Sequence, residues 1–184
     1  MEERIDCPAY IVLDIPSPTA EWIQSVRKRF DEERSLLPAE LTLTGSSGTG
    51  LIVQGQSVRE ISEHLDRAAE KIRPFYAEFG TVQRFENTDI YFLDVKDPSP
   101  FELAHEIVSS SGIGFEESPY PFRPHCTLKL RKPPATLQEL LELFFLQAPK
   151  EPFLLDRLSI YALPTPDSCR LLHTVPLSGK QTSI

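Results

Sequence analysis

The sequence contains few cysteines, and they are not arranged to build a cross-linked or metal-held fold. Its three cysteines, Cys7, Cys126 and Cys169, are odd in number and show no Cys-x-x-Cys spacing. Disulfide frameworks and zinc sites need paired cysteines at close, repeated spacings. We therefore expect neither a disulfide framework nor a zinc site, and such cysteine usage is typical of a reducing cytoplasm.

The sequence also lacks a run of about 18 apolar residues, the length that crosses a bilayer as a helix. Its first residues, Met1 to Asp6, are charged and mostly acidic. A secretory signal instead begins with basic and then apolar residues. Apolar residues make up 40% of the chain and charged residues 25%, as in soluble globular proteins. These features predict a cytoplasmic protein with no membrane partner.

Acidic residues outnumber basic residues in this chain. The chain has 19 Lys and Arg against 27 Asp and Glu, a net charge of −8, and its pI is near 5.1. A protein that grips a long polyanion normally carries a basic face and often a high pI. The charge balance therefore argues against extended RNA or DNA as a partner, while a small phosphate ester in one local basic pocket remains compatible with it.

The most informative stretch is residues 123–130, Arg-Pro-His-Cys-Thr-Leu-Lys-Leu. The residue before a proline favours extended backbone, and side chains alternate between the two faces of a strand. His125, Thr127 and Lys129 therefore share one face, and the apolar residues between them share the other. An imidazole and a hydroxyl within ~7 Å along a strand suit an anionic group. The hydroxyl donates a hydrogen bond, and the imidazole donates or removes a proton.

A similar stretch occurs 85 residues earlier (127 minus 42). Aligning Thr42 with Thr127 also sets a leucine against a leucine and Glu40 against His125. An isolated His-x-Thr is common by chance and then marks only the polar face of a strand. Two similar short strands about half a chain apart instead suggest an internal duplication.

Hydrophobic periodicity divides the chain into strands and helices. The expected strands cover residues 10–15, 40–44, 51–53, 81–85, 89–95, 125–130, 153–163 and 169–177. The expected helices cover residues 17–34, 57–76, 100–110 and 136–145, and the last is apolar enough to belong to the core. The segment 112–124 reads as a loop that delivers the chain to His125.

This order of elements predicts an α+β fold with two pseudo-symmetric lobes. Each lobe is expected to be an antiparallel sheet with outer helices, and a cleft lies between them. Residues 1–178 are expected to form a single domain, and residues 179–184 a flexible tail. We expect the protein to be a monomer.

Two loops adjoin the motifs. Glycine-rich loops such as Gly45–Gly50 can cradle phosphate with backbone N–H groups, but this one lacks the Lys-Ser/Thr ending of a P-loop and joins strand to strand. Its alternatives are a mobile turn, a flap or a phosphate cradle. The other loop ends in Tyr120, Phe122 and Arg123, which suit a nucleotide base and its phosphate. Alternatively, the two aromatic residues only pack the loop.

The sequence Pro-Phe-Arg-Pro-His-Cys-Thr-Leu at 121–128, the opening strand and the order of elements resemble the two-histidine (2H) phosphoesterase superfamily. Within it, the chain is similar to 2′-5′ RNA ligase-like and cyclic phosphodiesterase-like proteins. The resemblance implies a 2′-5′ RNA ligase-like fold with two His-x-Thr/Ser motifs facing each other across a cleft. It also implies hydrolysis or formation of 2′-phosphodiester linkages on RNA ends or small cyclic nucleotides, without a metal or other cofactor.

The resemblance assigns roles to individual residues. His125 matches the second catalytic histidine, and Thr127 and Thr42 match the hydroxyls that hold the phosphate. Arg123 matches a position that is often basic. Glu40 stands where the family places its first histidine, so this chain departs from the pattern at one of its two motifs.

The chemistry needs a base for the attacking water and an acid for the departing ribose oxygen. A free carboxyl group is ionised at neutral pH, so Glu40 suits the base, with protonated His125 as the acid. To act as the acid, Glu40 would need its pKa raised by burial. A third alternative is recruitment of a divalent cation, for which one carboxylate is a poor site.

Three functions of different classes follow. The first is a phosphoesterase acting on a 2′,3′-cyclic phosphate or 2′-5′ phosphodiester of a nucleotide or RNA end, impaired by the change at Glu40. The second is a non-catalytic module that binds a nucleotide or RNA end through Thr42, Thr127 and Arg123. The third is an unrelated structural protein with a coincidental motif. The three functions differ in whether a cyclic nucleotide is hydrolysed, is bound without hydrolysis, or is not bound.

Overall fold

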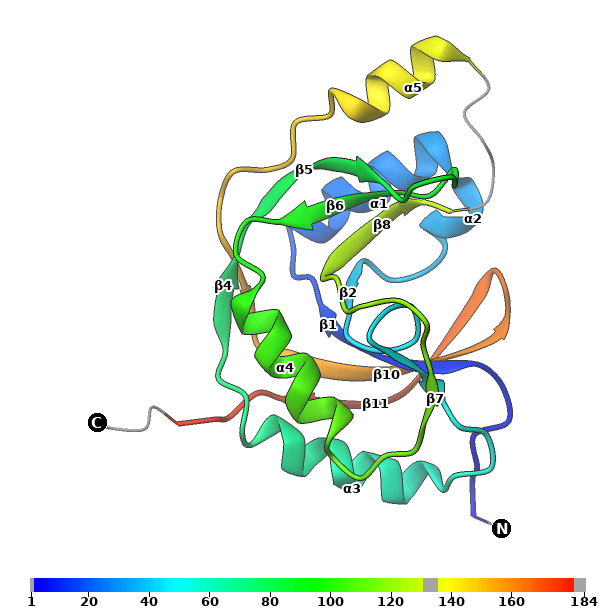
Figure 1. Ribbon diagram of the computed structural model, residues 1–184, viewed down its shortest axis with the longest axis vertical. Coiled ribbons are helices and arrows are strands. Elements are labelled where there is room, and N and C mark those ends of the chain that lie inside the picture. Colours follow the sequence, from blue (N-terminus) through cyan, green and yellow to red (C-terminus); the bar gives the residue numbers. More distant parts are fainter. Residues whose placement is uncertain (1, 131–135, 181–184) are drawn as a thin grey trace.

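A computed structural model describes residues 2–130 and 136–180 (Figure 1). Its largest sheet has four antiparallel strands in the order β11-β10-β1-β2. These strands are β1 (Ala9–Asp14), β2 (Glu40–Thr42), β10 (Arg157–Thr165) and β11 (Ser168–Pro176). The first five residues of β1 are buried, as its nearly continuous apolar sequence predicts.

A second sheet has three antiparallel strands in the order β5-β6-β8. They are β5 (Phe79–Arg84), β6 (Tyr91–Val95) and β8 (His125–Lys129). Two strand pairs complete the β structure. In one, β3 (Thr49–Ile52) pairs with β7 (Phe115–Glu117), and in the other β4 (Phe75–Ala77) pairs with β9 (Phe153–Leu155).

The helices divide between the two larger sheets. In Figure 1, α3 (Val58–Ala69) and α4 (Ser99–Ser109) lie in the half that holds the four-stranded sheet. The other half holds the three-stranded sheet with α1 (Thr19–Phe30), α2 (Glu32–Ser35) and α5 (Leu137–Phe144). The strands β2 and β8 are edge strands of their sheets, and they contact each other in the middle of the molecule. The predicted α+β fold with two lobes is therefore confirmed.

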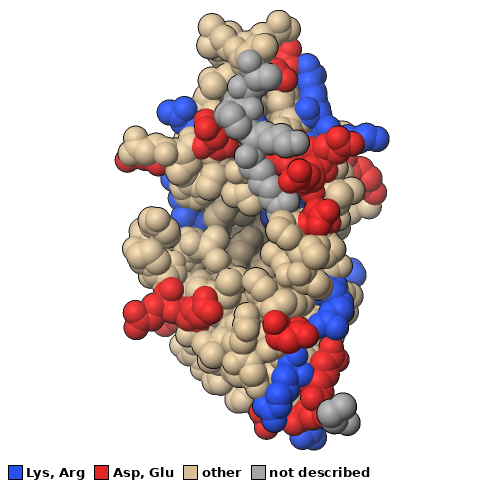
Figure 2. Space-filling model, turned by 90° about the vertical axis from the view of Figure 1, so that its right-hand side faces the viewer, with Lys and Arg blue, Asp and Glu red and all other residues tan. Residues whose placement is uncertain are grey.

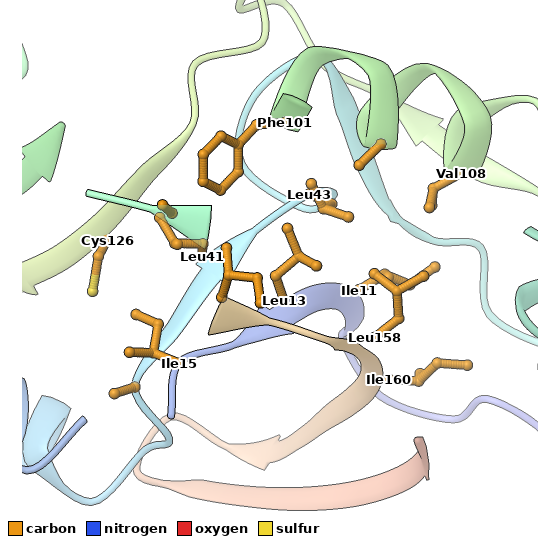
Figure 3. Close-up of a cluster of buried hydrophobic side chains, with 14 of the residues drawn as sticks. Ile11, Leu13, Ile15, Leu41, Leu43, Phe101, Val108, Cys126, Leu158 and Ile160 are labelled. Carbon is orange, nitrogen blue, oxygen red and sulfur yellow. The ribbon is translucent and has the colours of Figure 1, made fainter. Parts of the chain in front are cut away.

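One continuous hydrophobic core joins the lobes. Figure 3 shows Leu41 of β2 and Cys126 of β8 in this core, together with apolar side chains of β1, β10 and α4. Because side chains alternate along a strand, burying Leu41 and Cys126 turns Thr42 and Thr127 toward the opposite face. The core thereby fixes the direction of the two threonines.

Several element boundaries differ from the sequence prediction. The expected helix 17–34 is interrupted at Asp31, whose extended backbone (φ −156°) separates α1 from α2. The Asp31 carboxylate accepts the backbone N–H groups of Arg34 at 3.1 Å and Leu130 at 2.8 Å, so it begins a new helix. The helix α3 ends at Ala69 because Phe75–Ala77 enters a strand pair instead. The strand β7 lies within a segment that was expected to be a loop.

The prediction that α5 belongs to the core was wrong. Only its residue Leu143 is buried, and Leu137 is 74% exposed. Figure 1 shows that α5 projects from one end of the molecule, so only one side of it meets other elements. The rings of Phe144 and Tyr91 make a T-shaped contact with their centroids 5.6 Å apart.

Near the end of the described chain, the N–H of Ser178 donates to the carbonyl of Ala69, the last residue of α3, at 3.1 Å. The N–H of Gly179 donates to the carbonyl of Ile72 at 2.9 Å. Residues 181–184, which belong to the predicted tail, lie outside the described residues. Within residues 2–130 and 136–180, no helix combines the length and apolar character needed to cross a membrane.

Candidate functional site

A pocket of about 200 Å³ lies where β2 and β8 approach each other. Thr42 comes from β2, and His125 and Thr127 come from β8, so both motifs contribute to its wall. Figure 2 shows that one face of the molecule is hollowed at mid-height, between the two lobes. The remaining lining residues are Tyr10, Arg34, Thr44, Gly45, Ser46, Leu51, Phe85, Ile90, Leu130 and Leu163.

His125 is held in one orientation and is only 3% exposed. Its Nδ1 lies 2.6 Å from the carbonyl oxygen of Arg123. Because a carbonyl only accepts hydrogen bonds, Nδ1 must carry a proton, which leaves Nε2 as the acceptor in the neutral ring. Phe85 and Phe92 meet the imidazole edge-on at 5.2 and 5.3 Å between ring centroids. The geometry thus presents Nε2 as a group that can accept a proton.

The electrostatic setting keeps this imidazole neutral. Burial lowers the pKa of His125, and the charges of Arg123 and Arg34 lower it further, against the opposing effect of the hydrogen bond to the Arg123 carbonyl. A histidine whose pKa is below its ordinary value is uncharged at neutral pH. His125 is therefore suited to act as a general base.

Glu40 does not line the pocket. Its side chain is 1% exposed and forms ion pairs with two arginines, Arg34 and Arg27. The Arg27 Nη1 lies 3.6 Å from the Glu40 Oε2, and the Arg34 Nη2 is in direct contact with Oε1. The sequence predicted that Glu40 would stand beside the phosphate as a counterpart of His125. In the structure Arg34 is the pocket residue, and Glu40 is its partner.

Arg27 connects the two motif strands. It is fully buried, and its Nε donates to the carbonyl of Thr127 at 2.9 Å. Its Nη1 donates to the carbonyls of Pro38 at 2.7 Å and Leu37 at 3.2 Å, just before β2. Together with its ion pair to Glu40, these bonds fix β2, β8 and α1 relative to one another.

Sequence reasoning missed Arg34 and Tyr10, which also line the pocket. Burial alone would lower the pKa of Arg34, but neighbouring groups, above all the Glu40 carboxylate, raise it on balance, so the guanidinium stays charged. Burial also raises the pKa of Tyr10, which keeps the phenol protonated. The available signal was the spacing of Arg27 and Arg34, seven residues apart beside the apolar stripe of the predicted helix.

The structure places the three residues predicted to bind substrate beside the pocket rather than in its wall. Arg123 is exposed, and its guanidinium lies over the ring of Phe92 at 4.7 Å. Phe122 stacks on His105 with ring centroids 4.0 Å apart, and Tyr120 is 66% exposed. Their contact with substrate remains a prediction.

The glycine-rich loop lines one side of the pocket, and hydrogen bonds connect it to the loop before β8. Gly45 and Ser46 line the pocket directly. The N–H of Gly48 donates to the carbonyl of Tyr120 at 2.8 Å, and the hydroxyl of Ser47 accepts the N–H of Arg123 at 3.1 Å. The described residues contain no group of three or more His, Cys, Asp or Glu side chains placed to hold a metal ion.

Comparison with known sequences gives a family and several relatives. The sequence profile of the 2′-5′ RNA ligase superfamily matches residues 15–164. A protein of Bacillus thuringiensis (strain Al Hakam), named "Putative phosphoesterase", is 33% identical over 105 residues, which are 56% of this chain and 58% of that protein. A similarly named protein of Bacillus cereus (strain B4264) is 32% identical over 105 residues, with the same shares. The matched stretch thus spans little more than half the length of these relatives.

Comparison with solved structures supports the fold. TT0787 of Thermus thermophilus superposes with a TM-score of 0.62 at 17% identity, over 95% of this chain and 100% of that one. E. coli LigT complexed with NADP+ gives a TM-score of 0.61 at 17% identity, over 96% of this chain and 99% of that one. At such identities the likeness establishes a shared fold alone.

Proposed function

Because this chain belongs to the 2′-5′ RNA ligase superfamily, we propose that it is a phosphoesterase for the 2′,3′-cyclic phosphate or 2′-5′ phosphodiester of a nucleotide or RNA end. The observation that carries the proposal is the convergence of His125, Thr127 and Thr42 on one pocket from two facing edge strands. E. coli LigT has been solved with 3′-AMP and with NADP+, which supports a small nucleotide as the ligand.

The geometry favours His125 as the group that moves a proton. The Thr42 and Thr127 hydroxyls donate hydrogen bonds to the phosphoryl oxygens, and Nε2 of His125 faces the attacking water. As water attacks phosphorus, Nε2 takes its proton and the bond from phosphorus to a ribose oxygen breaks. That oxygen takes a proton from solvent, and the imidazolium later releases its own to solvent.

A single histidine implies slow turnover. Among residues 2–130 and 136–180, His125 is the one histidine that lines the pocket. Loss of one of two proton-transfer groups commonly lowers the rate by about 10²–10⁴. We therefore propose an enzyme with impaired chemistry, consistent with the replacement of the first histidine by Glu40.

The size of the pocket favours a substrate that enters by its phosphate end. Pockets that enclose a whole small molecule usually measure about 300–1,000 Å³, whereas this one measures about 200 Å³. The phosphate and part of the ribose would fill it, and the base would lie outside, against the loop that carries Tyr120 and Arg123. Such a shape suits a nucleotide or the terminus of an RNA.

The alternative is a module that binds a nucleotide without turnover, which the absence of a second imidazole from the described pocket wall favours. The two are separated by the hydrolysis of adenosine 2′,3′-cyclic monophosphate. We expect turnover by the wild type and a loss of about 10²–10⁴ in rate for His125→Ala.

His64→Ala is the matched control for this assay. His64 is half-buried and bonded to the Ser111 carbonyl at 2.7 Å, away from the pocket, so its loss should leave turnover unchanged. Binding without turnover in the wild type would support the module. A wild type that shows no binding and no turnover would contradict both functions.

A further inference from the structure

Among the described residues, two buried polar atoms of side chains that line the pocket have no hydrogen-bond partner. Arg34 is 8% exposed and Tyr10 is 6% exposed, and both line the pocket. Among the described residues, neither the Nε of Arg34 nor the hydroxyl of Tyr10 makes a hydrogen bond. Buried polar atoms in folded proteins nearly always have a partner, so each exception needs an explanation.

A cluster of charged side chains lies behind this wall of the pocket. The guanidinium groups of Arg34 and Arg27 both pair with Glu40, so two cations share one carboxylate. The Asp31 carboxylate also acts electrostatically on Arg34, and its oxygens accept the backbone N–H groups of Arg34 and Leu130. Arg27 also donates to three backbone carbonyls. Of the two arginines, Arg34 is the one that lines the pocket, so its positive charge can attract an anionic ligand there.

We propose that Arg34 and Tyr10 bind the phosphoryl oxygens of the ligand, and that Glu40 orients Arg34 instead of transferring a proton. This inference rests on the proposed function only in requiring a ligand with a phosphoryl group. A guanidinium presents several N–H donors in a planar fork that matches phosphate oxygens. The phenol adds one neutral donor.

This arrangement explains the change in the first motif. A protonated histidine at a phosphate site supplies a positive charge as well as a proton. Arg34 supplies the charge permanently, but it is not deprotonated and so cannot act as an acid or a base. The site therefore keeps the positive charge that a protonated first histidine would supply and loses the acid–base function of that histidine. Attraction to a permanent cation grows with the charge of the ligand, so a phosphomonoester dianion should bind more tightly than a cyclic phosphate monoanion.

Calorimetric titration with inorganic phosphate and adenosine 2′-monophosphate tests the proposal. We expect Arg34→Lys, which keeps the charge but loses the fork, and Tyr10→Phe each to weaken binding about tenfold or more. The matched controls are Arg170→Lys and Tyr76→Phe. Arg170 pairs with Glu3 on the surface and Tyr76 is 70% exposed, so both variants should bind as the wild type does.

The outcomes separate this inference from the proposed function. Wild-type affinity in Arg34→Lys and Tyr10→Phe, alongside weak binding in Thr127→Val, would overturn the inference and leave the function standing. Binding that depends on Arg34 in a protein that turns over no cyclic nucleotide would support the inference and contradict the function. Failure of the wild type to bind either probe would overturn both.

The role of Glu40 needs a measurement that general destabilisation does not affect. If Glu40 acts through Arg34, Glu40→Gln weakens phosphate binding in the wild-type background and adds no further loss in the Arg34→Lys background. A purely structural effect would lower the melting temperature in both backgrounds without this difference in affinity. Equal affinity losses in both backgrounds would overturn the positioning role. If Glu40→Gln does not fold, the Arg34→Lys and Tyr10→Phe titrations decide the proposal.

Discussion

Replacing Glu40 with glutamine should destabilise the fold strongly, because it removes a buried carboxylate that pairs with both Arg27 and Arg34. Both arginines are buried, and Arg27 is fully so. Breaking a buried ion pair by removing one partner costs about 3–5 kcal/mol, since the remaining charge stays buried without compensation. For a domain of about 150–250 residues, each kcal/mol shifts the melting temperature by about 2–4 °C. We therefore expect Glu40→Gln to melt about 6–20 °C below the wild type.

Differential scanning calorimetry at neutral pH measures this difference, with Glu78→Gln as the control. Glu78 pairs with Lys96, and both of these side chains are substantially exposed. Exposed pairs contribute about 0–1 kcal/mol, so the control should melt within about 4 °C of the wild type. A Glu40→Gln protein as stable as the control would refute the reasoning, because it would show that the two guanidiniums do not depend on Glu40.

Four further predictions follow from the site. The acidic limb of the kcat/KM profile for cyclic nucleotide hydrolysis should lie below pH 6.5, because burial lowers the pKa of the base His125; a limb above about 6.5, the ordinary value, would contradict this. Because the pKa of His125 is lower in the folded than in the unfolded chain, the unfolded chain takes up the His125 proton at a higher pH as the solution is acidified. The free energy of unfolding should therefore fall as pH drops below about 6.5. In urea titrations this slope should be shallower for His125→Gln. Glu40→His should gain no hydrolytic activity, since residue 40 lies outside the pocket wall; a large gain in the same assay would show an intact two-histidine geometry. Tyr120→Ala should raise the KM for a cyclic nucleotide while leaving the affinity for inorganic phosphate unchanged, and a loss of phosphate affinity would place Tyr120 at the phosphate instead.

The strands of the site were predictable because their residues alternate strictly between apolar and polar. Burial of Leu41 and Cys126 determines the direction of Thr42 and Thr127, and this alternation is visible in the sequence. The two-lobed α+β fold followed from the order of the elements and from the resemblance carried by residues 121–128. In both cases the relevant information is local in the chain.

The pocket residues and the helix exposure that the sequence did not predict depend on contacts between segments distant in the chain. Arg34 reaches the pocket only because Asp31 interrupts the helix and caps α2, and the Asp31 carboxylate is also bonded to Leu130 across the fold. Tyr10 was read simply as part of a buried strand, yet it lines the pocket. The apolar face of α5 predicted burial, but helical spacing does not reveal whether a partner lies opposite.

The most direct test of the central claim is a long-range ¹⁵N NMR spectrum of the four histidines during titration with adenosine 2′-monophosphate. We expect His125 to be the Nδ1-protonated tautomer in the free protein and its Nε2 resonance to shift on binding. His64, His105 and His173 should keep their positions, because none of them lines the pocket. A ligand that shifts another histidine and leaves His125 unchanged would contradict a phosphate-ester site built on the two facing strands.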